Sequence, residues 1–157
     1  MSEINTQQQD TELLQLVGFR LGKEEFAVDI LNVNEILKML EVTEVPNSPD
    51  CIEGIVNIRG RIIPVIETRL KLNMQKKEYD KDTRIMVVET NDKTVGFIVD
   101  EVNEVLRISK DITEPPPDLV TANIESDYIT SVARLEDRLL ILLDLKKLMS
   151  SEELVEV

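Results

Sequence analysis

The most constraining feature of this sequence is a motif that occurs twice, 69 positions apart. The segment VNEIL at 33–37 returns as VNEVL at 102–106. The similarity extends backwards, where FAV at 26–28 aligns with VGF at 95–97, and each follows a polar turn flanked by apolar runs. That pattern is typical of a β-hairpin. Repeated segments at a fixed spacing indicate a duplicated unit, so we expect the chain to fold as two related halves.

A third match, RIIPVIE at 61–67 with RLLILLD at 138–144, has a spacing of 77 residues. The longer spacing indicates about eight extra residues in the second copy. Short apolar runs rich in β-branched residues recur in both copies between turn residues. We therefore expect a mostly β fold of two pseudo-symmetric, five-stranded small β-barrels with short helical turns. The expected strands cover 13–21, 25–30, 30–40, 55–59 and 61–66, then 83–89, 95–99, 102–107, 129–135 and 139–143.

The sequence also predicts a division of the chain into segments. A charged stretch between the two copies breaks the strand pattern and is the best candidate for a linker. Whether the first strands of one copy complete the barrel of the other is left open by periodicity. The predicted segments are a flexible leader at 1–10, a first barrel at 11–72, a linker at 73–82, a second barrel at 83–149 and an acidic tail at 150–157.

Two stretches of the first copy need local arguments. The apolar spacing in residues 30–40 suits a helix or a bent strand, and we favour the strand because the equivalent 99–108 is rich in β-branched residues. Ser48 or Asp50 can cap a short helical turn after the proline-rich turn. Gly60 is expected to take a positive φ in a tight turn, because glycine adopts that conformation without a steric penalty.

Charge and hydropathy exclude several classes of partner. The chain has 31 acidic and 18 basic residues, a formal charge of −13 that repels a phosphate backbone, so we expect no nucleic acid partner. Its apolar runs are far shorter than the roughly 20 residues of a membrane span, so we expect no direct membrane insertion. The polar first fifteen residues do not resemble a secretory signal. We therefore expect a cytoplasmic protein.

The residue types needed for several kinds of catalysis are missing. The chain has no histidine, which excludes Ser-His-Asp and Cys-His devices, and its five glycines form no phosphate-binding loop. The single cysteine, Cys51, is expected to pack rather than react. We predict no catalytic residue, no metal site and no cofactor. A hydrolase that uses an acidic pair remains the alternative from another class, although the pairs Glu24 with Glu25, Asp80 with Asp82, and Glu125 with Asp127 are expected to be solvated.

Residues 54–66 form the most distinctive run, a strand pair that carries polar Asn57 and Arg59 beside glycines. One interpretation is that Arg59 pairs with a carboxylate such as Glu35 and stiffens the barrel. The other makes this corner part of a docking groove. The two interpretations are compatible.

Four motifs follow one another along the chain: FAVDILNVNEIL from 26, VPNSP from 45, GIVNIRGRIIPVIETR from 54 and VGFIVDEVNEVL from 95. In this order they resemble the CheW family of chemotaxis coupling proteins, and the resemblance covers about residues 13–149. The resemblance implies a non-enzymatic adaptor that joins the cytoplasmic tips of methyl-accepting chemoreceptors to the histidine kinase CheA, through the kinase's regulatory domain. It places the protein in the cytoplasm, at the periphery of membrane receptor arrays.

The resemblance also implies where partners bind. In that family the helical hairpin tip of the receptor lies in an apolar groove between the barrels. The positions that match the receptor-coupling residues of the family are Val33, Glu35, Gly54, Arg59, Gly96 and Val102.

A second surface is expected at the barrel ends, where strand edges and apolar residues invite pairing. We predict that the kinase binds there, at Ile30, Ile36 and Met39. A CheW-like module of a CheV-type protein, which carries a receiver domain as well, is the alternative within this class. We expect the shorter adaptor because nothing after Val157 would form a receiver.

Overall fold

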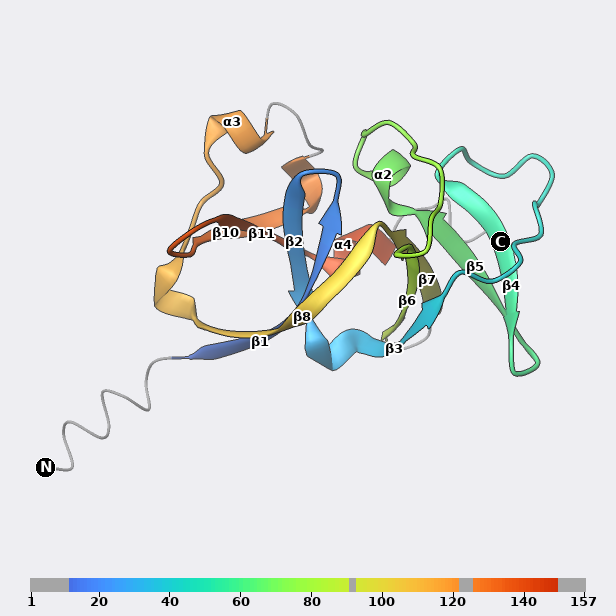
Figure 1. The fold of residues 1–157 in the computed structure, drawn as a ribbon, viewed down its shortest axis with the longest axis horizontal. Coiled ribbons are helices and arrows are strands. Elements are labelled where there is room, and N and C mark those ends of the chain that lie inside the picture. Colours follow the sequence, from blue (N-terminus) through green and yellow to red (C-terminus); the bar gives the residue numbers. More distant parts are fainter. Residues whose placement is uncertain (1–11, 91–92, 122–125, 150–157) are drawn as a thin grey trace, which may run out of the picture.

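The computed structural model describes residues 12–90, 93–121 and 126–149. Apolar runs rich in β-branched residues make most of this chain extended, many of the strands are buried on both faces, and short helical turns occur between strands (Figure 1). The elements are β1 (Leu13–Leu21), β2 (Glu24–Asp29), η1 (Ile30–Asn32), β3 (Val33–Lys38), β4 (Ile52–Ile58), β5 (Arg61–Glu67), α2 (Thr68–Lys71), β6 (Arg84–Thr90), β7 (Lys93–Val99), β8 (Glu101–Ser109), η2 (Lys110–Ile112), β9 (Thr113–Glu114), α3 (Asp118–Thr121), η3 (Ser126–Tyr128), β10 (Ile129–Arg134), β11 (Leu139–Leu143) and α4 (Leu145–Met149).

Within the described residues the strands form two mixed sheets. Sheet A has six strands in the order β8-β1-β2-β11-β10-β9, and sheet B has five in the order β3-β6-β7-β5-β4. The repeat spacings of 69 and 77 map each strand of sheet B onto a strand of sheet A, in the same order. Each sheet contains one parallel pair, β2 with β11 and β5 with β7. The two sheets are therefore related by the duplication that the sequence predicts.

The β1–β2 hairpin is exchanged between the copies. It belongs to the first copy in the sequence, but it pairs with β8 on one side and β11 on the other. The β6–β7 hairpin of the second copy lies in turn between β3 and β5. The strand exchange that the sequence left open is thus present in both sheets. The subdomain boundaries themselves stay a prediction, because strand pairing crosses them.

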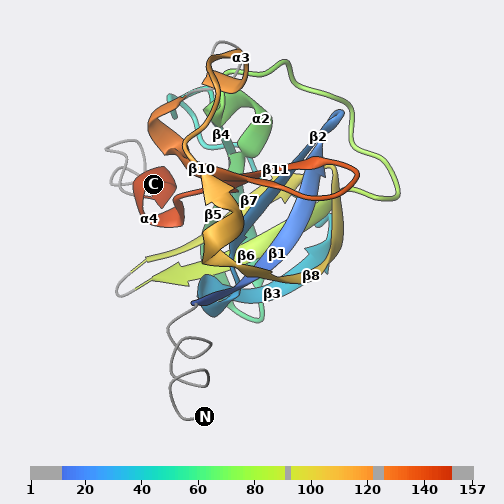
Figure 2. The same ribbon diagram turned by 90° about the vertical axis from the view of Figure 1, so that its left-hand side faces the viewer.

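Three apolar cores follow from this arrangement. The central core lies between the sheets and contains the largest buried rings, Phe19 and Phe26 from sheet A and Phe97 from sheet B. Core B packs against the other face of sheet B, around Ile85 and Ile98. Core A does the same for sheet A, around residues such as Leu140. Each sheet thus has an apolar core of its own on one face and shares the central core on the other, and the ribbon shows both sheets to be curled (Figure 2).

The sheets differ from the expected barrels in how far they close. In the described part of the chain neither sheet is closed by a strand pair between its edges. In sheet B a single bridge from Thr43 to Ile55 joins the segment after β3 to β4. The mostly β fold with short helical turns is confirmed, with mixed sheets of six and five strands rather than two closed five-stranded barrels.

Several local predictions can be compared with the structure. The segment 30–40 is a strand from Val33, as favoured, although its first three residues form the turn η1. The helical turn predicted after Asp50 is absent, because Ile52 already begins β4 and pairs with Ile66. Gly60 has φ +85°, as expected. The leader, the acidic tail and Glu125 lie outside the described residues.

A matched pair of positions shows how the duplicated sheets have diverged. Gly96 in β7 corresponds to Ala27 in β2, and Ile85 in β6 corresponds to Leu16 in β1. A Cβ on Gly96 would lie 2.8 Å from Cγ2 of Ile85, a fully buried side chain. Leu16 branches one carbon later, and sheet A accommodates a methyl group at Ala27. The β-branched Ile85 therefore explains why sheet B has glycine here.

We predict that Gly96→Ala destabilises the protein by about 1–3 kcal/mol, the usual cost of overpacking a core. The double variant Gly96→Ala/Ile85→Leu reproduces the pair found in sheet A and should recover at least about 1 kcal/mol relative to additivity. Urea unfolding of the four proteins in this cycle measures both quantities. Additive effects of the two substitutions would show that Ile85 does not impose the glycine.

Candidate functional site

The ion pair between Arg59 and Glu35 joins the two edges of sheet B. Arg59 lies in the β4–β5 turn with φ +50°, and its Nη2 donates to the Glu35 carboxylate on β3. Arg59 is 72% exposed and Glu35 is 24% exposed. The hydrogen bond with Glu35 and the nearby negative charge raise the pKa of Arg59. The predicted pairing is confirmed, and it fixes an exposed guanidinium at the corner of the sheet.

Sheet A repeats this arrangement with a different division of roles. Arg138, in the β10–β11 turn, contacts Glu104 on β8 at 3.2 Å and the buried Glu25 on β2 at 2.7 Å. In sheet B two arginines make the corresponding contacts. Arg59 binds Glu35 on the edge strand β3, and Arg61 donates to the hydroxyl of Thr94 on β7. The expectation that Glu25 is solvated is wrong, because the exchanged hairpin brings it beside an arginine from the other copy.

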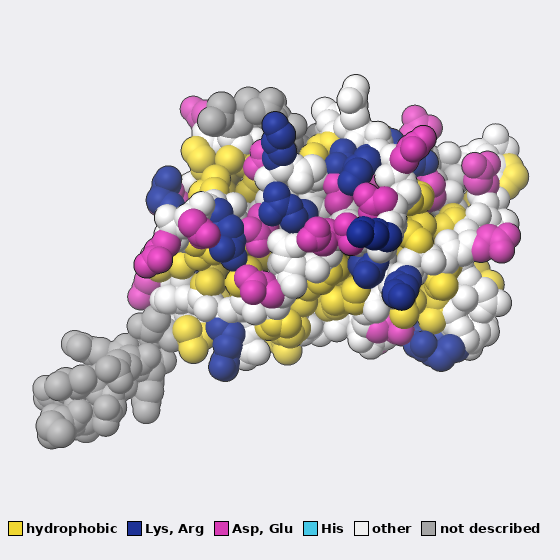
Figure 3. Space-filling model, viewed as in Figure 1, with side chains coloured by type: hydrophobic (Ala, Val, Ile, Leu, Met, Phe, Trp, Pro, Cys, Tyr) yellow, Lys and Arg dark blue, Asp and Glu magenta, His cyan; other side chains and the backbone are white. Residues whose placement is uncertain are grey.

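Val33 and Val102 lie on the edge strands β3 and β8, which run near each other in both ribbon views (Figures 1 and 2). We call this region the inter-sheet junction. Both valines are half-buried and pack against the central core. Apolar side chains gather over β8 and η1 on the face shown in Figure 3, among mixed charges. A partner helix that binds there would contact side chains anchored in the core of both sheets.

Gly54 and Gly96 are buried and contact the protein's own chain. A Cβ on Gly54 would lie 2.2 Å from the carbonyl oxygen of Thr43, so glycine allows the close approach of the bridge that joins this segment to β4. Gly96 faces Ile85 inside sheet B, as described above. The structure places neither glycine on a surface that a partner could touch directly. Any effect of these two positions on coupling would act through the shape of sheet B.

The three residues predicted for kinase binding occupy different environments. Ile36 is 40% exposed on the outer face of β3. Ile30 is half-buried against the central core, and Met39 is half-buried against core B. The sequence analysis missed Leu40 and Ile62, which are exposed and line one shallow hollow of about 510 Å³.

We call Ile36, Leu40 and Ile62 the outer patch of sheet B. Ile62 belongs to β5, in which residue 61 and residue 62 are both exposed before the strand becomes buried. The apolar pattern of the sequence does not reveal that Ile62 is exposed, because RIIPVI predicts a continuous buried strand. The apolar patch therefore became visible only when the strand was placed in the sheet.

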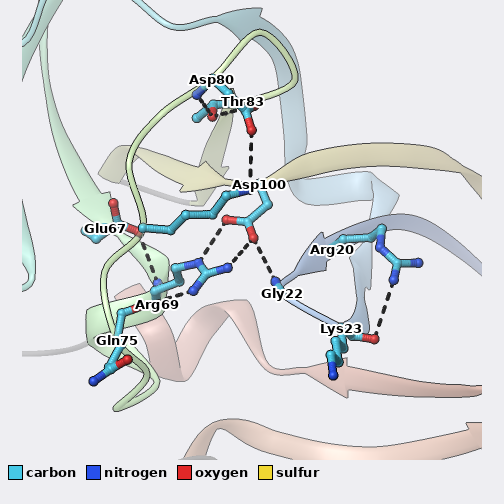
Figure 4. Close-up of polar contacts among 10 residues, drawn as sticks. Arg20, Gly22, Lys23, Glu67, Arg69, Gln75, Asp80, Thr83 and Asp100 are labelled. Carbon is cyan, nitrogen blue, oxygen red and sulfur yellow. Dashed lines mark hydrogen bonds and ion pairs between the residues drawn. The ribbon is translucent and has the colours of Figure 1, made fainter.

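Asp100 holds the point where the chain passes from sheet B to sheet A (Figure 4). It is the single residue between β7 and β8. Its carboxylate accepts hydrogen bonds from Arg69 Nε at 2.9 Å, Arg69 Nη2 at 2.5 Å and the backbone N–H of Gly22 at 2.7 Å. Both charged side chains are largely buried, at 13% and 14% exposure. We call these three residues the crossover contact.

Burial opposes ionisation of Asp100, but the hydrogen bonds from Arg69 and Gly22 outweigh it, so the pKa of Asp100 is lowered. Glu67 is in the opposite situation. It is buried at 1% exposure and accepts a hydrogen bond of 2.5 Å from the hydroxyl of Tyr79, which ties the linker down. Burial raises the pKa of Glu67 in spite of that bond.

These carboxylates do not form an acidic dyad. A hydrolase of the kind considered above needs two carboxyl groups in one cleft with pKa values pushed apart. Glu67 is covered by Tyr79 of the linker, and the carboxylate of Asp100 is occupied by Arg69 and the N–H of Gly22, so neither carboxylate is free to act on a substrate. Among the described residues no group of three or more Cys, Asp or Glu could hold a metal ion. The helices of the same ranges are all too short or too polar to cross a membrane.

Comparison with known proteins agrees with this geometry. A family model described as a CheW-like domain matches residues 15–153. The chemotaxis protein CheW of Klebsiella aerogenes is 40% identical over 139 residues, which are 88% of this chain and 83% of that protein. The chain belongs to the CheW family. The CheW of Helicobacter pylori is 35% identical over 146 residues, covering 93% of this chain and 87% of the relative.

The CheW fold is shown by a solved structure. The crystal structure of the scaffolding protein TtCheW from Thermoanaerobacter tengcongensis superposes with a TM-score of 0.81 at 35% identity, over 90% of this chain and 96% of that one. The protein is thus a CheW chemotaxis adaptor, a member of a non-enzymatic scaffolding family. The chemotaxis protein CheV3 of Helicobacter pylori is also similar, at 28% identity, but the chain covers 49% of its length.

The lowered pKa of Asp100 predicts a pH dependence of stability. An unperturbed aspartate titrates near pH 4, so the ionised form contributes its full stabilisation above about pH 5. That contribution is lost as the pH falls towards the lower value of the folded state. The difference in unfolding free energy between wild type and Asp100→Asn should therefore be constant from about pH 5 to 7 and shrink below about pH 4.

Urea unfolding at a series of pH values measures this difference. Asp82→Asn, which changes an exposed carboxylate of the linker, is the matched control. If the difference in unfolding free energy between wild type and Asp100→Asn does not vary with pH, the pKa of Asp100 is not lowered in the folded protein.

Proposed function

We propose that this adaptor couples the cytoplasmic tips of methyl-accepting chemoreceptors to the regulatory domain of the histidine kinase CheA, in the cytoplasm beside membrane receptor arrays. Membership of the CheW family supports chemotaxis signalling partners in general. The observation that carries the finer proposal is the presence of two apolar surfaces made of different side chains, which share strand β3. They are the inter-sheet junction and the outer patch of sheet B.

The receptor hairpin binds at the inter-sheet junction in this proposal. Val33 and Val102 supply apolar contacts that are backed by the central core, so they lose little side-chain entropy on binding. Arg59, from the β4–β5 turn, binds Glu35 on β3 and fixes this edge of the sheet. Gly54 and Gly96 act indirectly, by allowing sheet B to adopt the curvature that presents β3.

The kinase domain binds at the outer patch of sheet B. Ile36, Leu40 and Ile62 expose apolar area without a covering element among the described residues. Arg59 stands beside this patch in the β4–β5 turn and can supply a charged contact at its rim. Ile30 packs against the central core and Met39 against core B, so neither belongs to the exposed surface of the patch.

An adaptor of this kind acts by linkage. It changes kinase output only if it binds the active and inactive states of its partners with different affinity. Holding receptor and kinase at separate surfaces also raises their effective concentration. No chemical step is required of the adaptor.

The test of the function is a calorimetric titration of the full chain with a purified CheA regulatory domain, first alone and then with a receptor-tip hairpin already bound. We expect saturable binding in both titrations, because the two surfaces are made of different side chains. Loss of kinase binding in the presence of the hairpin would mean that the surfaces overlap. Absence of heat with either partner, for protein shown to be folded, would refute the proposal.

A charge placed on the outer patch separates the two interactions. Ile36→Asp/Ile62→Asp should weaken binding of the kinase domain at least 30-fold, roughly 2 kcal/mol, while the affinity for the receptor hairpin stays within about twofold. Val105→Asp is the matched control, because Val105 is the repeat equivalent of Ile36 and is exposed on β8. Loss of both affinities, or equal loss in the control, would show that this patch is not the kinase surface.

A further inference from the structure

The chain passes between the two sheets at two points. The first crossover is η1, which leads from β2 in sheet A to β3 in sheet B. The second is Asp100, the single residue that leads from β7 in sheet B to β8 in sheet A. Since strands within a sheet are held by hydrogen bonds, the relative orientation of the two sheets depends on these crossovers and on packing in the central core.

Among the described residues, an ion pair between separate elements is found at the second crossover. Arg69 binds both oxygens of Asp100, and its Nη1 also donates to the carbonyl of Gln75 at 3.0 Å. The backbone N–H of Asp100 donates to the carbonyl of Arg20 at 3.1 Å, so its main chain and side chain both contact the β1–β2 hairpin. Helix α2, the linker, the crossover and the exchanged hairpin thus meet at one guanidinium–carboxylate pair (Figure 4).

The pseudo-symmetric position lacks this contact. The repeat equivalent of Asp100 is Leu31 in η1, which is 87% exposed. The equivalent of Arg69 is Lys146 in α4, which is exposed. At the first crossover Asp29 accepts a hydrogen bond from the N–H of Leu31, which is a local cap and reaches no other element.

We propose that the crossover contact sets the angle between sheets A and B and thereby holds the inter-sheet junction in the shape that accepts the receptor hairpin. Arg69 and Asp100 are positioning residues. Asp100 lies two residues before Val102 on the same chain, so its placement fixes the start of β8. This inference rests on the proposed function in one respect, namely that the receptor binds at the junction.

The geometry of the contact makes it directional. A guanidinium that binds both oxygens of a carboxylate fixes orientation as well as distance, which a lysine ammonium cannot do. Another polar contact between the two halves, from Lys93 Nζ on β7 to the carbonyl of Met149 in α4 at 3.0 Å, uses a flexible lysine. Loss of the directional contact should therefore widen the range of angles while the apolar central core keeps the sheets together.

The experiment measures partner affinity and inter-sheet distance in the full chain. The variants are Arg69→Gln, Arg69→Lys and Asp100→Asn, the last because it removes the charge but keeps the shape and can still accept from Gly22. Spin labels are placed at Lys38→Cys on β3 and Arg107→Cys on β8, both exposed, in a Cys51→Ala background. Arg134→Gln is the matched control, because it removes an arginine that pairs with Glu114 inside sheet A.

We expect the three variants to bind a receptor-tip hairpin at least tenfold more weakly than wild type and to show a broader distribution of label distances. The distribution of label distances in Arg69→Lys should be broader than that in wild type and narrower than that in Arg69→Gln. Affinity for the CheA regulatory domain should stay within about twofold, since the outer patch lies wholly on sheet B. The control should match wild type in every measurement.

Two results would overturn the inference, and they differ from failure of the proposed function. Unchanged hairpin affinity and distance distribution in folded Asp100→Asn would show that the contact does not position the junction. Equal loss of hairpin and kinase affinity would show that it serves only general stability. If wild type itself does not bind the hairpin, the proposed function fails, and an unchanged distance distribution would then reject the structural part as well.

Discussion

The exchange of the β1–β2 hairpin is the constraint on which the rest of the structure depends. Because β1 pairs with β8 and β2 pairs with β11, sheet A cannot form until strands from both ends of the chain have met. Sheet B requires the reverse exchange of β6 and β7. Each half of the sequence therefore completes the other, and contacts of large sequence separation hold the fold together. The central core, which both sheets line, is a consequence of this exchange.

An exchanged fold must control how its two sheets face each other. Hydrogen bonding within a sheet does not do this, and an apolar core resists separation more than it resists rotation, since hydrophobic burial is not directional. The protein instead has a largely buried arginine–aspartate pair at one crossover, anchored to the tip of the exchanged hairpin through Gly22. A buried pair of this kind contributes more to the uniqueness of the structure than to its net stability. For an adaptor that presents surfaces to two partners, the relative position of those surfaces is the functional property.

Divergence between the copies shows how one strand order serves two surfaces. In sheet B, Arg59 contacts the edge strand β3 and Arg61 contacts β7 of the exchanged hairpin. The outer patch is exposed on the same sheet. Sheet A combines these roles in Arg138, whose contacts include the buried Glu25. The glycine at position 96 and the alanine at position 27 show the same divergence inside the sheets, because the β-branched Ile85 lies against Gly96 whereas Leu16 occupies the equivalent position in sheet A. The strand order has been kept while the side chains that reach partners have changed.

The sequence by itself determined the duplication, the mostly β class, most strand positions and the resemblance to a chemotaxis adaptor, and it suggested Glu35 as one partner for Arg59. These follow from local patterns, such as the repeated VNEIL motif and the alternation in β1, which strand geometry requires. Only the tertiary structure decided that hairpins are exchanged, that Glu25 is buried against Arg138, that Ile62 is exposed, and that Arg69 and Asp100 join the sheets. Residues 69 and 100 are 31 positions apart in the sequence. Neither periodicity nor composition specifies which strands become neighbours, because pairing is settled by contacts between segments that are distant in the chain.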